Sequence, residues 1–288
     1  MLHGKPADQA IRMVPLIYAV CGRAQGQAAA LALAAARGIE TLPFLDPLVE
    51  AEVLREHLWR LLLDFPPQLG LPAQHDLFLA ATRAATATDR DAFGMLLSHD
   101  FWNALLQELQ QLPDLADTHP ALLPTVGARK SCEIWPQLDT NFAAMPTWQG
   151  LPAETGAYAR WGGQNPTAAP ALAARWQARC AEVWSWAAGE AKVGAGGTAS
   201  AASAGPGRGR ALVETARGVL MHEITLAGDT IRDYVIVAPT EWNFHPQGIL
   251  TEWLQGSTFE SEAALRKYVA QAVGTLDPCV PWELELLT

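Results

Sequence analysis

The sequence predicts an α+β fold that is predominantly helical, with a small antiparallel β-hairpin or sheet near the C-terminus. Apolar residues recur at helical spacing in several segments of the first 190 residues. Two apolar segments, residues 219–227 and 231–238, flank Gly228 and Asp229, a pair that tolerates the positive φ angles of a tight hairpin turn. A run rich in glycine, alanine and serine separates these two regions.

These observations divide the chain into three parts. Residues 1–191 are expected to form a helical body that carries an N-terminal cysteine motif. Residues 192–210, KVGAGGTASAASAGPGRGR, have no large side chains to pack and are expected to be a flexible linker without the order of a phosphate-binding loop. Residues 211–288 are expected to pack back onto the body, so that the whole chain forms one domain.

Helices are expected where apolar spacing is bounded by caps or helix breakers. The expected helices are residues 22–37, 47–64, 74–86, 89–112, 171–189 and 259–273, with mostly irregular chain over 113–170. Cys21 precedes the first of them, and the positive end of that helix is expected to favour its thiolate form. His57 is expected on the polar side of the second.

Composition restricts the classes of function. The 288 residues, of which 50% are hydrophobic, suffice to bury a core, and a formal charge of −10 argues against a nucleic-acid or anionic-membrane partner. No stretch reaches the roughly 18 apolar residues that span a bilayer, and no signal peptide is evident, so the protein is expected in the cytoplasm. The four cysteines lie far apart and are expected to be thiols.

Five short motifs carry the chemistry. They are VCGRAQGQA over residues 20–28, PAETGAYAR over 152–160, ARG over 216–218, PTEWN over 239–243 and DPC over 277–279. In this order around a hairpin, they resemble the large subunit of nickel-iron hydrogenases, most strongly over the last 70 or so residues. That resemblance implies a truncated fold of the large-subunit type.

The chain departs from the enzyme's pattern at the metal ligands. The resemblance implies four cysteine ligands, of which Cys21 and Cys279 remain, while Ala24 and Trp282 stand at the other two positions. Both motif histidines are also replaced. Since two thiolates cannot complete a four-thiolate nickel centre, neither nickel nor hydrogenase activity is expected, and the chain is expected to be an accessory protein rather than an enzyme.

Other residues of the family's pocket are retained. Arg217 matches the arginine over the metal site, and Thr240 matches the hydroxyl that hydrogen-bonds an iron-bound cyanide, so both are candidates for binding an Fe(CN)2(CO) fragment. His245 follows the PTEWN motif and is a further candidate, and His222 could also add nitrogen ligation. The metal candidates are Cys21 and Cys279.

The resemblance is therefore to the assembly proteins of the HupK/HoxV kind. It implies a maturation scaffold that transiently holds the iron fragment or transfers it to the hydrogenase large-subunit precursor, with maturation factors and that precursor as partners. An alternative stays open, in which the chain is a non-catalytic mimic of the large subunit that acts as an interaction protein or chaperone without metal.

Overall fold

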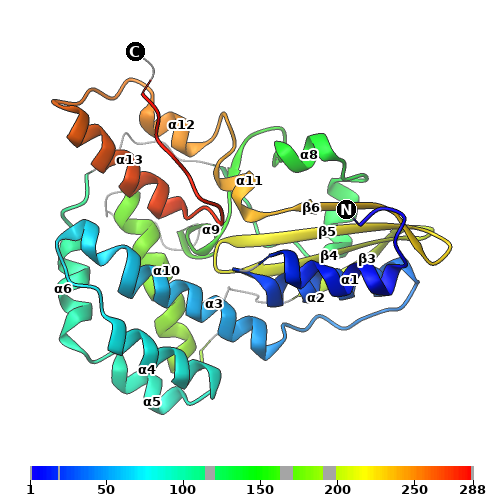
Figure 1. Cartoon of the computed structure of the whole chain (residues 1–288), viewed down its shortest axis with the longest axis horizontal. Helices are drawn as coiled ribbons and strands as arrows, with labels where there is room; N and C mark the ends of the chain where they lie inside the picture. Colours follow the sequence, from blue (N-terminus) through cyan, green and yellow to red (C-terminus); the bar gives the residue numbers. More distant parts are fainter. Residues whose placement is uncertain (1, 19, 114–120, 163–170, 191–198, 287–288) are drawn as a thin grey trace.

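The structure is a computed structural model that describes residues 2–18, 20–113, 121–162, 171–190 and 199–286. A four-stranded sheet and a group of helices form its two main parts, and Figure 1 shows α1 and α2 lying along the sheet with α3 to α6 and α10 grouped on one side. The α+β class with predominant helix is thus confirmed. Within the described ranges, no helix combines the length and apolar character needed to cross a bilayer.

The sheet is an antiparallel meander in the order β3, β4, β5, β6. Its strands are β3 (Ser200–Gly205), β4 (Arg208–Thr215), β5 (Gly218–Ala227) and β6 (Thr230–Val237). The predicted hairpin is confirmed as β5 and β6, and Gly228 adopts the left-handed conformation in its turn, with φ 59°. A turn of this kind connects strands without splaying their right-handed twist.

The predicted linker is wrong for residues 200–210, because these residues form β3 and the start of β4. Residues 192–198 of that prediction lie outside the described residues. The small side chains have a packing role: a Cβ on Gly209 would lie 2.1 Å from the backbone nitrogen of Ala36 in α2. Glycine and alanine at these positions let a helix lie directly on the sheet. The same composition is also typical of a linker, which is why the prediction was wrong.

Two N-terminal helices cover one face of this sheet. The predicted helix at 22–37 is present as α2 (Gly22–Ala36), and an additional helix, α1 (Ala7–Ile17), packs on α2. The chain just before α1 pairs with the sheet, since the Gly4 N–H donates to the Ile231 carbonyl at 2.8 Å. The N-terminal residues are therefore fixed against β6, which lies late in the sequence.

The helical part matches most of the predicted segments. Its elements are α3 (Pro47–Trp59), a π-helical turn (Arg60–Asp64), a 3-10 turn (Pro66–Leu69), α4 (His75–Thr86), α5 (Arg90–Leu96), α6 (Asp100–Leu109) and α10 (Ala171–Ala188). The single helix predicted over 89–112 is instead two helices. The first ends at Leu96, and His99 caps α6 by accepting a hydrogen bond from the Phe101 N–H at 3.2 Å.

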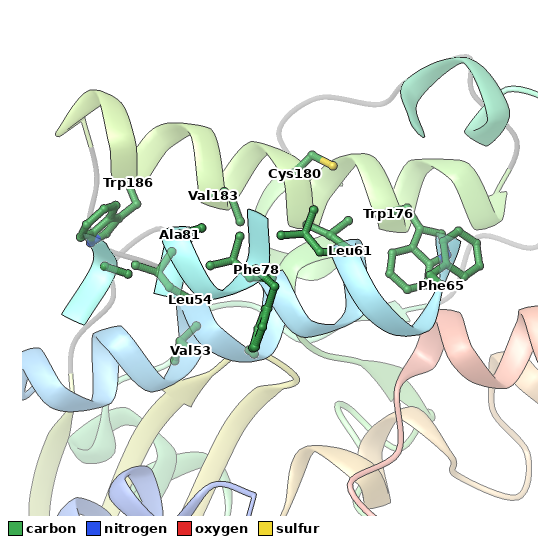
Figure 2. Packing of buried hydrophobic residues seen from close by; sticks show 14 of the residues in the cluster. Val53, Leu54, Leu61, Phe65, Phe78, Ala81, Trp176, Cys180, Val183 and Trp186 are labelled. Atoms are coloured by element: carbon green, nitrogen blue, oxygen red, sulfur yellow. The ribbon is translucent and has the colours of Figure 1, made fainter. Parts of the chain in front are cut away.

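Helix α10 packs against the main hydrophobic core, and Figure 2 shows its Trp176, Val183 and Trp186 side chains beside those of the preceding helices. The Trp176 ring stacks on Phe65 with ring centroids 3.8 Å apart, and Trp186 meets Phe93 edge to face at 5.0 Å. Offset and edge-to-face aromatic pairs add stability beyond their buried area. This core fixes α3 against α10, and both helices supply charged side chains to the site described below.

His57 is a correction to the expected polar face of α3. Its side chain is fully buried, and its Nε2 lies 2.8 Å from the Glu182 carboxylate of α10. Burial lowers the pKa of His57, although Glu182 acts in the opposite direction. A partner 125 positions away in the chain therefore hydrogen-bonds one nitrogen of this ring inside the core.

Short elements connect and close the fold. Between α6 and α10 lie β1 (Ala121–Leu122), α7 (Ala128–Ile134), α8 (Thr140–Ala144), β2 (Ala153–Glu154) and α9 (Ala157–Gly162), and after the sheet come α11 (Pro239–Asn243), α12 (Ile249–Leu254) and α13 (Glu262–Leu276). The final helix starts later than predicted, because Ser261 caps it by accepting from the Ala264 N–H, and it continues past Gly274.

Candidate functional site

A cavity of about 390 Å³ lies where both ends of the chain meet the sheet. Its walls come from residues within 17–18, 20–25, 215–220, 236–241 and 279–280. Four predicted site residues line it together, namely Cys21, Arg217, Thr240 and Cys279. The structure thus brings to one place motifs that are widely separated in the sequence.

Cys21 is the residue that immediately precedes α2. Its thiol is largely shielded from water, and this burial raises its pKa to about 11. The expected thiolate form is therefore not the form that the free protein favours, because desolvation outweighs the partial charge of the helix end. The Gln25 side-chain amide, one turn further along, contacts Cys21 Sγ at 3.7 Å.

Cys279 is held by the first turn of α11. The Thr240 hydroxyl donates to Cys279 Sγ at 3.1 Å, and it accepts a hydrogen bond from the Cys279 N–H at 3.4 Å. Thr240 is thus engaged with the sulfur itself. All four cysteines of the chain are free thiols, as the sequence predicts.

The turn that carries Arg217 connects β4 and β5 and packs against a second glycine turn. Gly218 has φ 130° and Gly156 has φ 107°, and a Cβ on Gly156 would lie 2.8 Å from the Arg217 carbonyl oxygen. Asn243 joins the two turns, since its Nδ2 donates to the Arg217 carbonyl at 3.2 Å and its Oδ1 accepts from the Thr155 N–H at 2.9 Å. The motifs at 152–160, 216–218 and 239–243 are therefore one hydrogen-bonded unit.

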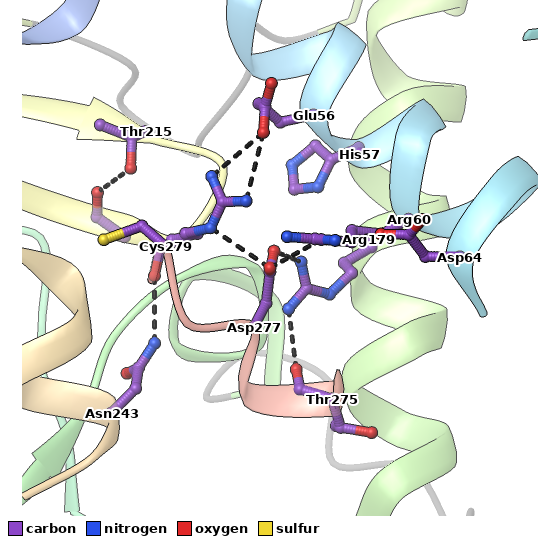
Figure 3. Close-up of polar contacts among 12 residues, drawn as sticks. Glu56, His57, Arg60, Asp64, Arg179, Thr215, Asn243, Thr275, Asp277 and Cys279 are labelled. Atoms are coloured by element: carbon purple, nitrogen blue, oxygen red, sulfur yellow. Dashed lines mark hydrogen bonds and ion pairs between the residues drawn. The ribbon is translucent and has the colours of Figure 1, made fainter. Parts of the chain in front are cut away.

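The Arg217 guanidinium is buried, at 5% exposure, and held by two carboxylates. Both terminal nitrogens lie 3.2 Å from Glu56 Oε2, and Nε lies 3.2 Å from Asp277 Oδ1, as Figure 3 shows. Buried arginines need such partners, because an unpaired charge in a protein interior is costly. These contacts fix the guanidinium at the cavity wall and connect α3 to the segment that carries Cys279.

Asp277 anchors that segment from a left-handed backbone conformation, with φ 59°. Its carboxylate contacts Arg60 at 2.7 Å and Arg179 at 3.1 Å in addition to Arg217 (Figure 3). Burial alone would raise the pKa of Asp277, but the three arginines together hold it below its ordinary value. Cys279 thus lies two residues after an aspartate that three arginines hold in place.

Two predicted histidines lie elsewhere. His245 is buried in the loop after α11, where its Nδ1 accepts from the Gln247 N–H at 3.1 Å, and it is not among the residues that line the cavity. His222 lies inside the interface of β5 with α2, hydrogen-bonded to Gln25 and Tyr234. Among the residues that the structure describes, no three His, Cys, Asp or Glu side chains gather as a metal-binding cluster.

Sequence reasoning missed several residues of the site. Tyr18, Gln25 and Glu241 line the cavity, and burial raises the pKa of both Tyr18 and Glu241. Gln25 could have been found, because residues four apart on a helix share a face with Cys21 at its start. Glu56 carries no such signal, since only the folded chain places α3 beside Arg217.

The fold belongs to a known class. The structure is similar to the Ni-Fe-Se hydrogenase of D. vulgaris Hildenborough in its oxidised state, with a TM-score of 0.62 and 15% identity over 96% of this chain and 89% of that one. It is also similar to an NAD⁺-reducing [NiFe]-hydrogenase, with a TM-score of 0.58 and 17% identity over 96% of this chain and 88% of the other. The chain therefore has the fold of the nickel-iron hydrogenase large subunit.

Sequence relatives give the family. The chain is 30% identical to the hydrogenase expression/formation protein HoxV of Cupriavidus necator, over 99% of its own length and 89% of the relative's. It is 31% identical to HupK of Bradyrhizobium diazoefficiens, over 99% and 88% respectively. It belongs to this HoxV/HupK family of hydrogenase expression/formation proteins. No protein-family model matches the chain.

Proposed function

We propose that this protein acts in the maturation of nickel-iron hydrogenases as a scaffold that transiently holds an Fe(CN)2(CO) fragment and passes it to the large-subunit precursor. The observation that carries this proposal is the cavity in which Cys21 and Cys279 lie with Arg217 and Thr240. The relatives' names, hydrogenase expression/formation proteins, support an accessory role rather than catalysis.

The chemistry of the cavity suits a fragment that brings most of its own ligands. Two sulfurs offer soft ligands to iron, while cyanide and carbon monoxide occupy its other positions. Each thiol releases its proton as the metal binds, because the thiolate is the ligand form. The N–H groups of Arg217 that Glu56 and Asp277 do not take are the donors that suit a cyanide nitrogen.

The residues at the two remaining ligand positions oppose a nickel centre. Ala24 is buried in the core beneath the cavity side of α2, and Trp282 is 44% exposed beyond Cys279. Neither side chain can bind a metal.

Infrared spectroscopy tests the proposal. The protein is purified anaerobically from cells that express the maturation machinery, and its spectrum is compared with that of the Cys21→Ser/Cys279→Ser variant. We expect cyanide and carbonyl stretching bands in the unmodified protein and none in the double variant. Cys132→Ser, which changes a thiol on α7 away from the cavity, serves as the matched control and should keep the bands. Protein without bands, isolated together with maturation partners, would overturn the scaffold role.

One observation favours the second candidate function, an interaction protein or chaperone that mimics the large subunit without binding metal. Apolar side chains that line the cavity are exposed, among them Ile17 at 43% and Val280 at 56%, and Leu16, next to Ile17 in the sequence, is 84% exposed. Contiguous exposed apolar groups mark protein interaction sites. This function predicts that hydrogenase maturation in cells survives Cys21→Ser/Cys279→Ser but is lost with Leu16→Asp, whereas the scaffold predicts loss with the double cysteine variant.

A further inference from the structure

A chain of three polar side chains, of which His222 and Gln25 are buried and Tyr234 is partly exposed, leads through the interface between the sheet and α2 to Cys21. The Tyr234 hydroxyl lies 2.8 Å from His222 Nδ1, and His222 Nε2 lies 2.9 Å from Gln25 Oε1. The Gln25 Nε2 then contacts Cys21 Sγ at 3.7 Å. His222 and Gln25 are at most 1% exposed.

The hydrogen-bond directions in this chain follow from the orientation of the Gln25 amide, whose oxygen faces His222 and whose NH₂ group faces Cys21. His222 is buried without a carboxylate partner, so burial lowers its pKa to about 3 and it is neutral, with one N–H. That N–H is on Nε2, where it donates to the Gln25 carbonyl oxygen, while Nδ1 accepts from the Tyr234 hydroxyl. Gln25 thus presents its NH₂ group, a donor, to Cys21.

The position of these groups calls for a reason other than packing. A helix lying on a sheet is normally joined to it by apolar side chains, and buried polar groups contribute little net stability even when they are fully hydrogen-bonded. Ala28 and Ala32 of α2, on the same side of the helix, are buried apolar residues. The polar chain ends at the sulfur atom of Cys21, which lines the cavity. We therefore look for the role of the polar chain at that sulfur.

We propose that Gln25 is a positioning residue that keeps Cys21 Sγ as a hydrogen-bond acceptor and thereby lowers its electron donation to a bound metal, with His222 and Tyr234 fixing the orientation of the amide. This inference rests on the proposed function, in which Cys21 is a metal ligand. Hydrogen bonds to a ligating sulfur withdraw electron density from it without adding charge to the site. Thr240 gives Cys279 the same kind of neutral donor.

Cobalt(II) binding tests the inference without the iron fragment. Metal-free protein is titrated anaerobically with Co²⁺ alone, and the sulfur-to-cobalt charge-transfer absorption is recorded. We expect this band in the unmodified protein, reduced in Cys21→Ser. Gln25→Leu should shift the band to longer wavelength, because loss of the N–H donor raises the energy of the sulfur lone pairs. Gln25→Glu, which turns a carboxylate oxygen toward the sulfur, should shift it further.

Two further variants separate this role from a structural one. Tyr234→Phe removes only a hydroxyl and frees the His222 tautomer, so it should reproduce part of the Gln25→Leu shift without changing the packing volume. Gln27→Leu is the matched control, because this neighbouring amide on α2 contacts the Phe44 carbonyl instead of the cavity. It should leave the band unchanged.

The outcomes distinguish the two proposals. A charge-transfer band that is the same in the unmodified protein, Gln25→Leu and Tyr234→Phe would overturn the role of Gln25 while leaving the two-sulfur site intact. Absence of any band in the unmodified protein would overturn both the metal site and the role of Gln25. Should Gln25→Leu fail to fold, Tyr234→Phe decides the matter by itself.

Discussion

Asp277 is the single side chain on which most of the site's geometry depends. It holds Arg60, Arg179 and Arg217 while its own backbone is in the left-handed region, and Cys279 follows two residues later. Removing one member of a buried ion cluster leaves the other charges without compensation. The position of Cys279 in the cavity wall is thus tied to the charge of a neighbouring residue.

Replacement of this carboxylate should be strongly destabilising. We expect Asp277→Asn to lower the free energy of unfolding by about 3 to 5 kcal/mol, because three arginines lose their shared anion. Asp64→Asn provides the control: Asp64 also pairs with Arg60 but is exposed, so its loss should cost under about 1 kcal/mol. Urea unfolding of the three proteins measures the difference, and equal losses in both variants would contradict the central role of Asp277.

The candidate site residues could be selected from the sequence only where a motif carried them. Cys21, Arg217, Thr240 and Cys279 were identified in this way and share the cavity. Their immediate environments were not predictable. The pKa of Cys21 depends on burial, which a helix-end argument does not include. Likewise, the buried His57 is hydrogen-bonded to Glu182, which lies on a helix remote in the sequence.

At the scale of elements, the contact of α2 with β4 decides where Cys21 lies. Gly209 is the point of closest approach, since an added Cβ would meet the backbone of α2 at Ala32 and Ala36. Backbone atoms cannot move aside as a flexible side chain can. The helix therefore lies at a distance that only glycine permits.

A methyl group at this point should displace the helix. We expect Gly209→Ala to cost about 3 kcal/mol or more of stability through overpacking, and to weaken Co²⁺ binding because Cys21 moves with α2. Gly94→Ala is the control: this glycine lies within α5 with nothing near its added Cβ, so alanine should be neutral or stabilising by up to about 1 kcal/mol. Thermal unfolding and cobalt titration measure both effects, and normal cobalt binding by Gly209→Ala would contradict this account.

Local turn chemistry explains which elements the sequence revealed. The hairpin of β5 and β6 was predictable because Gly228 and Asp229 lie between two apolar runs. The neighbouring pair β3 and β4 was not, since its glycine, alanine and serine residues favour a linker by composition. These residues form strands because β4 pairs with β5 and packs closely against α2, and this close packing favours small side chains.

For the whole molecule, the buried and neutral side chain of His222 predicts that the free energy of unfolding falls in acid. The pKa of His222 falls from 6.5 to about 3 on folding, so between these values the unfolded chain binds a proton that the folded protein does not. The stability contribution is therefore complete above pH 6.5 and decreases as the pH falls toward 3.

The slope of stability against pH measures this contribution. In this range we expect the unmodified protein to lose up to about 1.4 kcal/mol more per pH unit than His222→Phe. Thr225→Val, which alters the same strand without removing a titratable group, should keep the slope of the unmodified protein. Urea unfolding at a series of pH values gives both slopes, and parallel curves for the unmodified protein and His222→Phe would refute the prediction.

The overall architecture was predictable as a class because the order of the motifs resembles that of the nickel-iron hydrogenase large subunit. Their actual meeting depends on contacts that no local pattern contains, such as the pairing of Gly4 with Ile231 and the ion pair of Glu56 with Arg217. The complete fold decides long-range contacts of this kind. Sequence spacing shows that two segments can meet, but it does not show which atoms come into contact.

The meeting of the chain ends also sets the order of events during synthesis. A ribosome produces the wall that holds Cys21 early, but the wall that holds Cys279 is among the last parts of the described chain to emerge. Closing so long a loop comes late in folding as well, because its entropy cost precedes the contacts that stabilise it. A growing chain therefore has no two-sulfur pocket, and whatever enters the cavity does so only after translation has passed Cys279.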